Sequence, residues 1–124
     1  MNYIDRSEYM QRLLDLMGTP DIKIITGVRR SGKSELMKAY IRRITETQAD
    51  ANIIFVDFFD LKYESLKEYH RLYDYIESHY VSDKKNYVFV DEVQLCEGFE
   101  LAVSSLHTSR KYDLYITGSN AFLL

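Results

Sequence analysis

Short apolar runs alternate along the chain with segments that are apolar on one side only. The runs are residues 22–26, 53–58, 87–91 and 114–117. Nearly continuous runs of this length are typical of strands that are buried on both faces of a parallel sheet. Between them, residues 33–44 and 99–106 carry apolar side chains at helical spacing. This alternation predicts an α/β fold in which a parallel sheet of about four strands is flanked by helices.

Two further helices are expected. Asp5 and Glu8 are spaced as a capping box, so a helix is predicted from about Ser7 to Met17. The stretch from Tyr63 to Tyr80 is rich in tyrosine, and its apolar positions form a helical stripe that we interpret as core packing. Connectors are predicted at residues 18–21, 45–52, 82–86 and 94–98.

The most specific pattern lies between the first predicted strand and the helix that follows it. Residues 27–34 read G-x-x-x-x-G-K-S, the pattern of a phosphate-binding loop in its usual place between strand and helix. Gly27 and Gly32 let the backbone wrap tightly because neither has a Cβ atom. Successive N–H groups then form a nest for anionic oxygen, to which the helix adds the positive end of its dipole. A glycine turn that happens to precede Lys-Ser is the alternative.

The residues of this loop have separate expected roles. Lys33 is expected to reach the β- and γ-phosphates, and the Ser34 hydroxyl to bind a magnesium ion. Because the variable side chains of such a loop tend to point away from the phosphates, Arg29 and Arg30 are expected to bind through their N–H groups. The expected nucleotide-binding residues are Gly27, Val28, Arg29, Arg30, Ser31, Gly32, Lys33, Ser34 and Glu35.

A second motif is the apolar run of residues 87–90, which ends in two carboxylates, Asp91 and Glu92. Ligands bind at the carboxyl ends of the strands in open α/β sheets, so this acid pair is expected to face the phosphate loop from one strand over. Asp91 is placed to hold magnesium through water, since that ion keeps several of its waters. Glu92 is placed to orient or deprotonate the attacking water. The alternative is a solvated strand end.

Three segments, residues 25–34, 89–94 and 116–124, resemble the AAA-type ATPases of bacteria and archaea. More narrowly, they resemble the prokaryotic group in which the ATPase core is followed by a carboxyl-terminal domain of poorly assigned role. The resemblance implies a three-layer P-loop NTPase fold of the ASCE class, with ATP and Mg²⁺ as ligands and hydrolysis of the β–γ bond. It also implies that Asn120 occupies the sensor-1 position, with Ser119 as the second choice. The residue at this position contacts the γ-phosphate or the attacking water. A glycine turn after a strand is the alternative there.

The chain ends at Leu124, whereas the cores of that family continue into another helix, a fifth strand and a helical lid. We therefore expect residues 1–124 to be the N-terminal part of a single, incomplete P-loop ATPase domain. The strand before the phosphate loop would lie at a sheet edge, which invites pairing with another chain. A homo-oligomer is expected through this edge or through an AAA-type assembly. The fragment alone is expected to be weakly active or inactive, because the transition-state arginine usually comes from a neighbouring subunit.

Composition narrows the function classes further. The net charge of the 124 residues is −3, so composition gives no argument for nucleic-acid binding. No apolar stretch approaches the roughly 20 residues of a membrane span, and the amino terminus lacks the pattern of a signal peptide. Cys96 is the one cysteine, so no internal disulfide forms. A cytoplasmic protein without a membrane partner is expected.

Three functions share the predicted site. The leading hypothesis is a Mg²⁺-dependent ATPase core that hydrolyses ATP to drive a conformational change in an appended domain, with Lys33, Glu92 and Asn120 as catalytic residues. A nucleotide-gated switch with little turnover would use the same residues, so the sequence does not separate the two. A small-molecule kinase is disfavoured, because such kinases usually lack a glutamate after the metal-binding aspartate. The sequence does not indicate whether the domain has a protein or a nucleic-acid partner.

Overall fold

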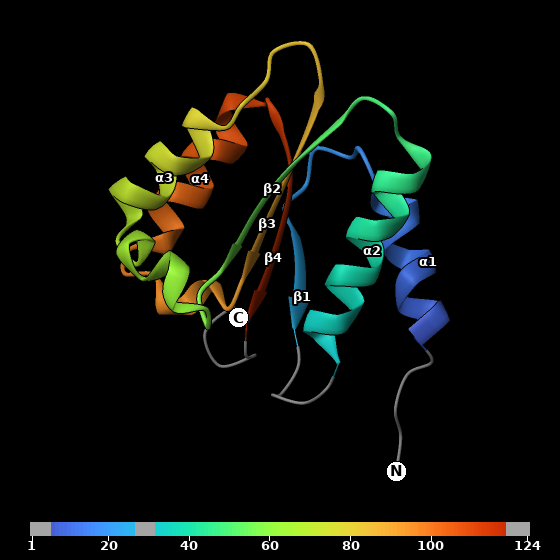
Figure 1. Cartoon of the computed structure of the whole chain (residues 1–124), viewed down its shortest axis with the longest axis horizontal. Coiled ribbons are helices and arrows are strands. Elements are labelled where there is room, and N and C mark those ends of the chain that lie inside the picture. The colour runs from blue at the N-terminus through green and yellow to red at the C-terminus, as the bar shows by residue number, and fades with distance from the viewer. Residues whose placement is uncertain (1–5, 27–31, 119–124) are drawn as a thin grey trace.

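A sheet of four parallel strands forms the centre of the molecule (Figure 1). The computed structural model describes residues 6–26 and 32–118. The strands are β1 Lys23–Thr26, β2 Ala51–Asp57, β3 Lys85–Asp91 and β4 Tyr112–Gly118. Their order across the sheet is β1-β4-β3-β2, so among the described residues β1 lies at an edge, as predicted. Because β4 lies between β1 and β3, the acid pair at the end of β3 is two strands away from β1, which precedes the phosphate loop. The prediction that the pair lies one strand over is therefore wrong.

Helices cover both faces of this sheet (Figure 1). On one face α1 (Arg6–Leu16) lies beside α2 (Lys33–Thr47), and on the other face α3 (Tyr69–Ser78) lies beside α4 (Phe99–Ser109). The result is the predicted three-layer α/β arrangement. Within the described ranges, no helix is both long enough and apolar enough to cross a membrane.

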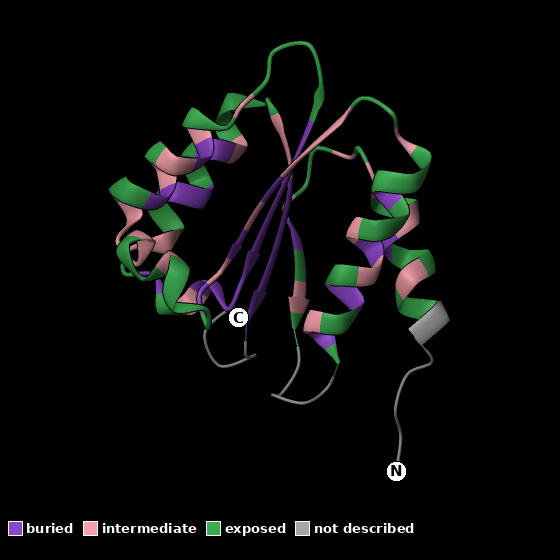
Figure 2. Ribbon diagram, in the orientation of Figure 1, coloured by how far each residue is buried: buried purple, intermediate pink, exposed green. Residues whose placement is uncertain are grey.

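The side chains of β3 point alternately into two separate cores. Val88 and Val90 join the cluster that packs against α3 and α4, whereas Tyr87 and Phe89 join the cluster on the side of α1 and α2. This alternation follows from the two-residue period of a strand. The central strands are buried along most of their length (Figure 2). Because burying each such side chain contributes about 1.5–3 kcal/mol, β3 is held firmly between the layers, and its last residue, Asp91, is held with it.

The tyrosine-rich segment forms two helices instead of the predicted one. A 3₁₀-helix, Leu61–Leu66, is followed by α3, which begins at Tyr69. The carboxylate of Glu68 accepts two N–H groups from the first turn of α3 and so caps that helix. The backbone on either side of Glu68 also bonds to the backbone of Glu97, in a bridge between distant parts of the chain. These bonds hold Glu68 in an extended conformation that a continuous helix would not allow.

Three predicted connectors contain more regular structure than expected, and in one of them, residues 82–86, β3 already begins at Lys85. The connector at residues 45–52 is reduced to three residues, because α2 continues to Thr47 and β2 begins at Ala51. The hydroxyls of Thr45 and Thr47 donate to carbonyl groups four residues earlier, so these polar residues remain within the helix. In the connector predicted at 94–98, part of a short 3₁₀-helix, Val93–Leu95, is present. The capping residue Asp5 lies outside the described residues.

Candidate active site

Three elements bring polar side chains together at the carboxyl edge of the sheet. α2 begins with Lys33 and Ser34, β3 ends at Asp91 and is followed by Glu92, and Thr117 lies near the end of β4. Gly32 precedes α2 with a φ of 86°, in the left-handed region. Glycine adopts this conformation without strain, which explains why the sequence pattern requires glycine at this position.

The two described residues with predicted catalytic roles form a buried ion pair. Nζ of Lys33 donates to Oε2 of Glu92, and the two residues are 8% and 2% exposed. The other carboxylate oxygen of Glu92, Oε1, accepts from Nε2 of Gln94 at 2.8 Å. A charge that is removed from water requires a partner of opposite charge or a hydrogen bond. Lys33 and Glu92 therefore neutralise each other, and the lysine predicted to bind phosphate touches the predicted base directly.

Ser34 and Asp91, the predicted magnesium ligands, are also in contact. Oγ of Ser34 donates to Oδ2 of Asp91 at 2.8 Å, and Asp91 is buried. Hydroxyl and carboxylate oxygens suit Mg²⁺, which is usually held by one or two carboxylates together with phosphates and water. No group of three or more His, Cys, Asp or Glu residues that could hold a metal occurs in the described part of the chain. The adjacent serine and aspartate therefore fit a magnesium site of this sparse kind.

Two residues of this edge are missed by the sequence analysis. Thr117 donates from Oγ1 to Oδ1 of Asp91 and accepts the N–H of Glu92 at 3.0 Å. Its signal in the sequence is a hydroxyl after an apolar run, on a strand that pairs with the acid-tipped strand. Gln94 holds Glu92 through its amide nitrogen, and its amide oxygen is buried without a hydrogen-bond partner within residues 6–26 and 32–118. No local pattern distinguishes such a glutamine from a loop residue.

The remaining predicted site residues stay predictions. Glu35 is exposed on the first turn of α2. The other residues lie outside the described ranges, and they are Gly27, Val28, Arg29, Arg30, Ser31, Ser119 and Asn120.

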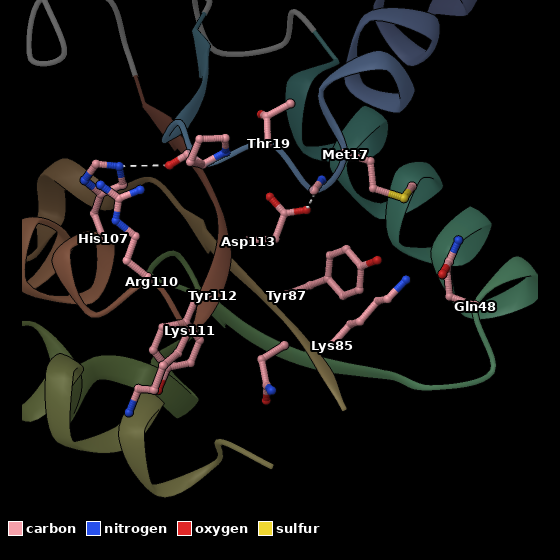
Figure 3. A pocket seen from close by; sticks show the side chains of 13 residues that line it. Met17, Thr19, Gln48, Lys85, Tyr87, His107, Arg110, Lys111, Tyr112 and Asp113 are labelled. Carbon is pink, nitrogen blue, oxygen red and sulfur yellow. Dashed lines mark hydrogen bonds between the residues drawn. The ribbon is translucent and has the colours of Figure 1, made fainter. Parts of the chain in front are cut away.

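A cavity of about 530 Å³ lies at the opposite, amino end of the strands (Figure 3). Its lining includes Thr19, Lys85, Tyr87, Arg110 and Asp113. Among the described residues, none of those predicted to bind nucleotide or metal contributes to it. The cavity is therefore separate from the candidate active site.

Comparison with known proteins gives the family. Residues 19–124, most of the chain, match the AAA domain family. The chain belongs to this family. An uncharacterised protein of Haemophilus influenzae is 39% identical over 124 residues, which is 98% of this chain and 31% of that protein. This AAA domain thus spans about a third of the length of the curated relative it matches.

A solved structure carries the same fold. The ORC2 protein of Aeropyrum pernix, determined as ADPNP–ADP complexes, matches 94% of this chain and 40% of its own, with a TM-score of 0.57 and 17% identity. At this identity the match concerns the fold alone. The predicted three-layer P-loop fold and the resemblance to AAA-type ATPases are confirmed. The domain is an AAA-type P-loop ATPase domain.

Proposed function

We propose that this AAA domain binds ATP with Mg²⁺ and hydrolyses the β–γ bond to drive a conformational change in an appended domain. The observation that supports this most directly is the pairing of Lys33 with Glu92 and of Ser34 with Asp91. The phosphate-loop pattern predicts that Lys33 binds phosphate and that Ser34 binds the metal. Each of these residues is in contact with one residue of the acid pair. The adenine nucleotides of the ORC2 complexes favour ATP as the ligand.

The binding of a phosphate group and the release of Glu92 are linked through Lys33. A phosphate group at the start of α2 competes with Glu92 for the ammonium group, because both are anionic oxygen acceptors. While Oε2 of Glu92 is bonded to Lys33 and Oε1 to Gln94, neither carboxylate oxygen is available to a water molecule. When Lys33 turns to the phosphates, Glu92 becomes free to take a proton from the attacking water. The base is thus activated only when a phosphate is present.

Ser34 and Asp91 are the residues that would hold the metal. When bound, Mg²⁺ supplies charge neutralisation at the β- and γ-phosphate oxygens. The contact between Oγ of Ser34 and Oδ2 of Asp91 brings the two ligand oxygens to the same point. The backbone N–H groups at the start of α2 add the positive end of the helix dipole beside it.

The test is the substitution Glu92→Gln in the full-length protein. The amide keeps the shape of the side chain but cannot accept a proton, so turnover should fall by about 10² or more, while ATP binding is retained. Glu100→Gln, an exposed glutamate on α4, is the matched control and should turn over like the wild type. A Glu92→Gln protein with wild-type turnover would refute the role proposed for Glu92.

A nucleotide-gated switch with slow hydrolysis is the second candidate. It is favoured by the fact that both carboxylate oxygens of Glu92 are bonded, one to Lys33 and one to Gln94. Steady-state turnover separates the two proposals. Fast hydrolysis, stimulated by a partner, supports a motor, whereas negligible hydrolysis with tight nucleotide binding supports a switch.

Self-association is also proposed, through the edge strand β1. Ile24 on this strand is 49% exposed, and in the described sheet one side of β1 has no neighbouring strand. Such an edge can pair with another strand. Light scattering at high protein concentration tests this, and a strictly monomeric protein would contradict it.

A further inference from the structure

We propose that Thr117 is the positioning residue of this site, because its single hydroxyl fixes both the metal-binding carboxylate of Asp91 and the backbone turn that presents Glu92. The inference rests on the proposed function, in which Asp91 holds Mg²⁺ and Glu92 is the base.

The register of the sheet places Thr117 beside the acid pair. β3 and β4 are parallel, with Val90 opposite Ile116, so the next residue of each strand, Asp91 and Thr117, lie at the same level of the sheet. Thr117 has no exposed surface. Its hydroxyl therefore makes its hydrogen bonds within the protein.

The direction of both hydrogen bonds of Thr117 is determined by chemistry. The N–H of Glu92 can only donate, so it donates to Oγ1 of Thr117, at 3.0 Å. The one hydroxyl hydrogen of Thr117 is then directed at Oδ1 of Asp91. The carboxylate of Asp91 is held at Oδ1 by Thr117, while Oδ2 faces Ser34. Thr117 thereby sets which carboxylate oxygen is turned toward the metal ligand Ser34.

The second bond acts on the backbone of Glu92. This residue has a φ of 57°, in the left-handed region. For residues other than glycine this conformation costs about 1–2 kcal/mol, and it persists where surrounding bonds impose it. The N–H of Glu92, bonded to a buried hydroxyl, is such a restraint. The turn directs the chain from β3 into the segment where Gln94 reaches back to Glu92.

A matched pair of substitutions isolates the hydroxyl. Thr117→Val keeps the branched shape, which suits a buried strand, and removes both bonds. Thr117→Ser keeps the hydroxyl and removes one methyl group. Loss of a residue that orients a metal ligand typically lowers metal affinity or activity about 10–100-fold. Thr117→Val should therefore raise the Mg²⁺ concentration for half-maximal turnover by about 10-fold or more, whereas Thr117→Ser should stay within about threefold of the wild type.

The measurement uses the full-length protein, with turnover and ATP binding titrated against Mg²⁺ and ATP binding also measured in EDTA. In EDTA, Thr117→Val should bind ATP like the wild type, because the phosphate loop is unchanged. Thr108→Val, on the exposed face of α4, is the control and should match the wild type throughout. This shift in Mg²⁺ dependence is a readout that loss of stability alone would not produce.

Two outcomes would overturn the inference. One is a folded Thr117→Val protein with wild-type Mg²⁺ dependence and turnover. The other is a Thr117→Ser protein whose Mg²⁺ requirement rises 10-fold or more, and this test remains valid if the valine variant does not fold. Failure of the proposed function gives a different result, since the wild type itself would then show neither Mg²⁺-dependent ATP binding nor hydrolysis.

Discussion

Two largely buried lysine–carboxylate pairs lie in the described part of the domain, one at each end of the sheet, and they differ in how completely they are bonded. At the amino end, Nζ of Lys23 lies 2.6 Å from Oδ1 of Asp113. At the carboxyl end, Lys33 pairs with Glu92. Within the described ranges, Glu92 is the one hydrogen-bonding partner of the Lys33 ammonium group, whereas the ammonium of Lys23 also donates to the carbonyl of Thr19.

The amino-end pair belongs to a network in which the surrounding polar groups also have partners. The second oxygen of Asp113 accepts the N–H of Gly18 and the hydroxyl of Tyr115, both at 2.9 Å. The hydroxyls of Tyr115 and Tyr40 are 2.6 Å apart, and the hydroxyl of Tyr40 also lies 3.1 Å from the carbonyl oxygen of Leu13. This network ties α1, α2, β1 and β4 together. A fully bonded buried network rigidifies a structure and leaves no group to offer to a ligand.

The comparison indicates how a buried charge pair can be assigned a role. Among the described residues, Lys33 can exchange Glu92 for another anion without losing any further hydrogen bond of its ammonium group. Lys23 cannot leave Asp113 without also losing its bond to the carbonyl of Thr19. We therefore assign the amino-end pair to stability and the carboxyl-end pair to binding and chemistry. The predictions below test this division.

The largest effect is expected for Lys23→Met. Removing one partner of a buried ion pair leaves an unpaired charge, here on Asp113, and typically costs about 3–5 kcal/mol. Urea unfolding should show this loss, while the variant at temperatures where it is folded should still bind Mg-ATP. Lys85→Met, an exposed lysine in the cavity lining, should leave unfolding unchanged. A Lys23→Met protein as stable as the wild type would break the assignment of this pair to stability.

The second prediction concerns ATP affinity, which should depend on Lys33 and not on Lys23. Lys33→Met removes a charge-assisted hydrogen bond to phosphate, worth about 1.5–3 kcal/mol, so ATP affinity should fall about 10- to 100-fold. Because the stabilisation by a ligand grows with the ratio of its concentration to its Kd, Mg-ATP at one fixed concentration should raise the unfolding temperature of Lys23→Met more than that of Lys33→Met. Calorimetric unfolding with and without Mg-ATP measures both. If ATP stabilised the two variants equally, the two pairs would not differ in function.

The two ends also differ in how far the sequence predicts them. The carboxyl-end residues are neighbours along the chain, Lys33 with Ser34 and Asp91 with Glu92, and each pair directly borders a regular element. Their roles can therefore be proposed from local motifs. Thr117 joins them only because β4 pairs with β3, and the sequence does not specify that pairing.

The amino-end network has no local signal at all. Lys23 and Asp113 are separated by 90 positions and are brought together by the register in which Lys23 lies opposite Tyr115. Taken alone, Lys23 is a polar residue in an apolar run and Tyr115 is one of 11 tyrosines. The break before α3 is unpredicted for the same reason, since it depends on bonds to the distant Glu97. Strands and helices follow from local periodicity, whereas long-range pairing must be observed.

The third prediction concerns Tyr115→Phe, which removes one hydroxyl from the amino-end network. Asp113 loses a donor and Tyr40 loses its hydroxyl partner, and unsatisfied buried polar groups cost about 1–3 kcal/mol. Urea unfolding near pH 8 should show a loss of this size, with ATP affinity unchanged. Tyr9→Phe, at an exposed position, is the control. If Tyr115→Phe and Tyr9→Phe lowered the free energy of unfolding equally, the hydroxyl of Tyr115 would have no particular role in this network.

The last and smallest effect is the pH dependence of the same network. Burial, together with the hydrogen bond to Tyr40 and the nearby charge of Asp113, raises the pKa of Tyr115 far above its usual value. Above about pH 10 the tyrosine of the unfolded chain ionises while that of the folded protein keeps its proton, so the unfolded state binds fewer protons and stability falls as pH rises. Each such group contributes a slope of up to about 1.4 kcal/mol per pH unit.

Tyr115→Phe removes one of these groups, so its free energy of unfolding should fall less steeply with pH above pH 10 than that of the wild type. The difference between the two proteins should therefore shrink between pH 8 and pH 11. Glu92→Gln, which changes the carboxyl-end pair, should leave this alkaline slope unchanged. Parallel wild-type and Tyr115→Phe curves in urea titrations across this range would place the pH sensitivity elsewhere, because the network at the amino end would then not hold Tyr115 in its neutral form.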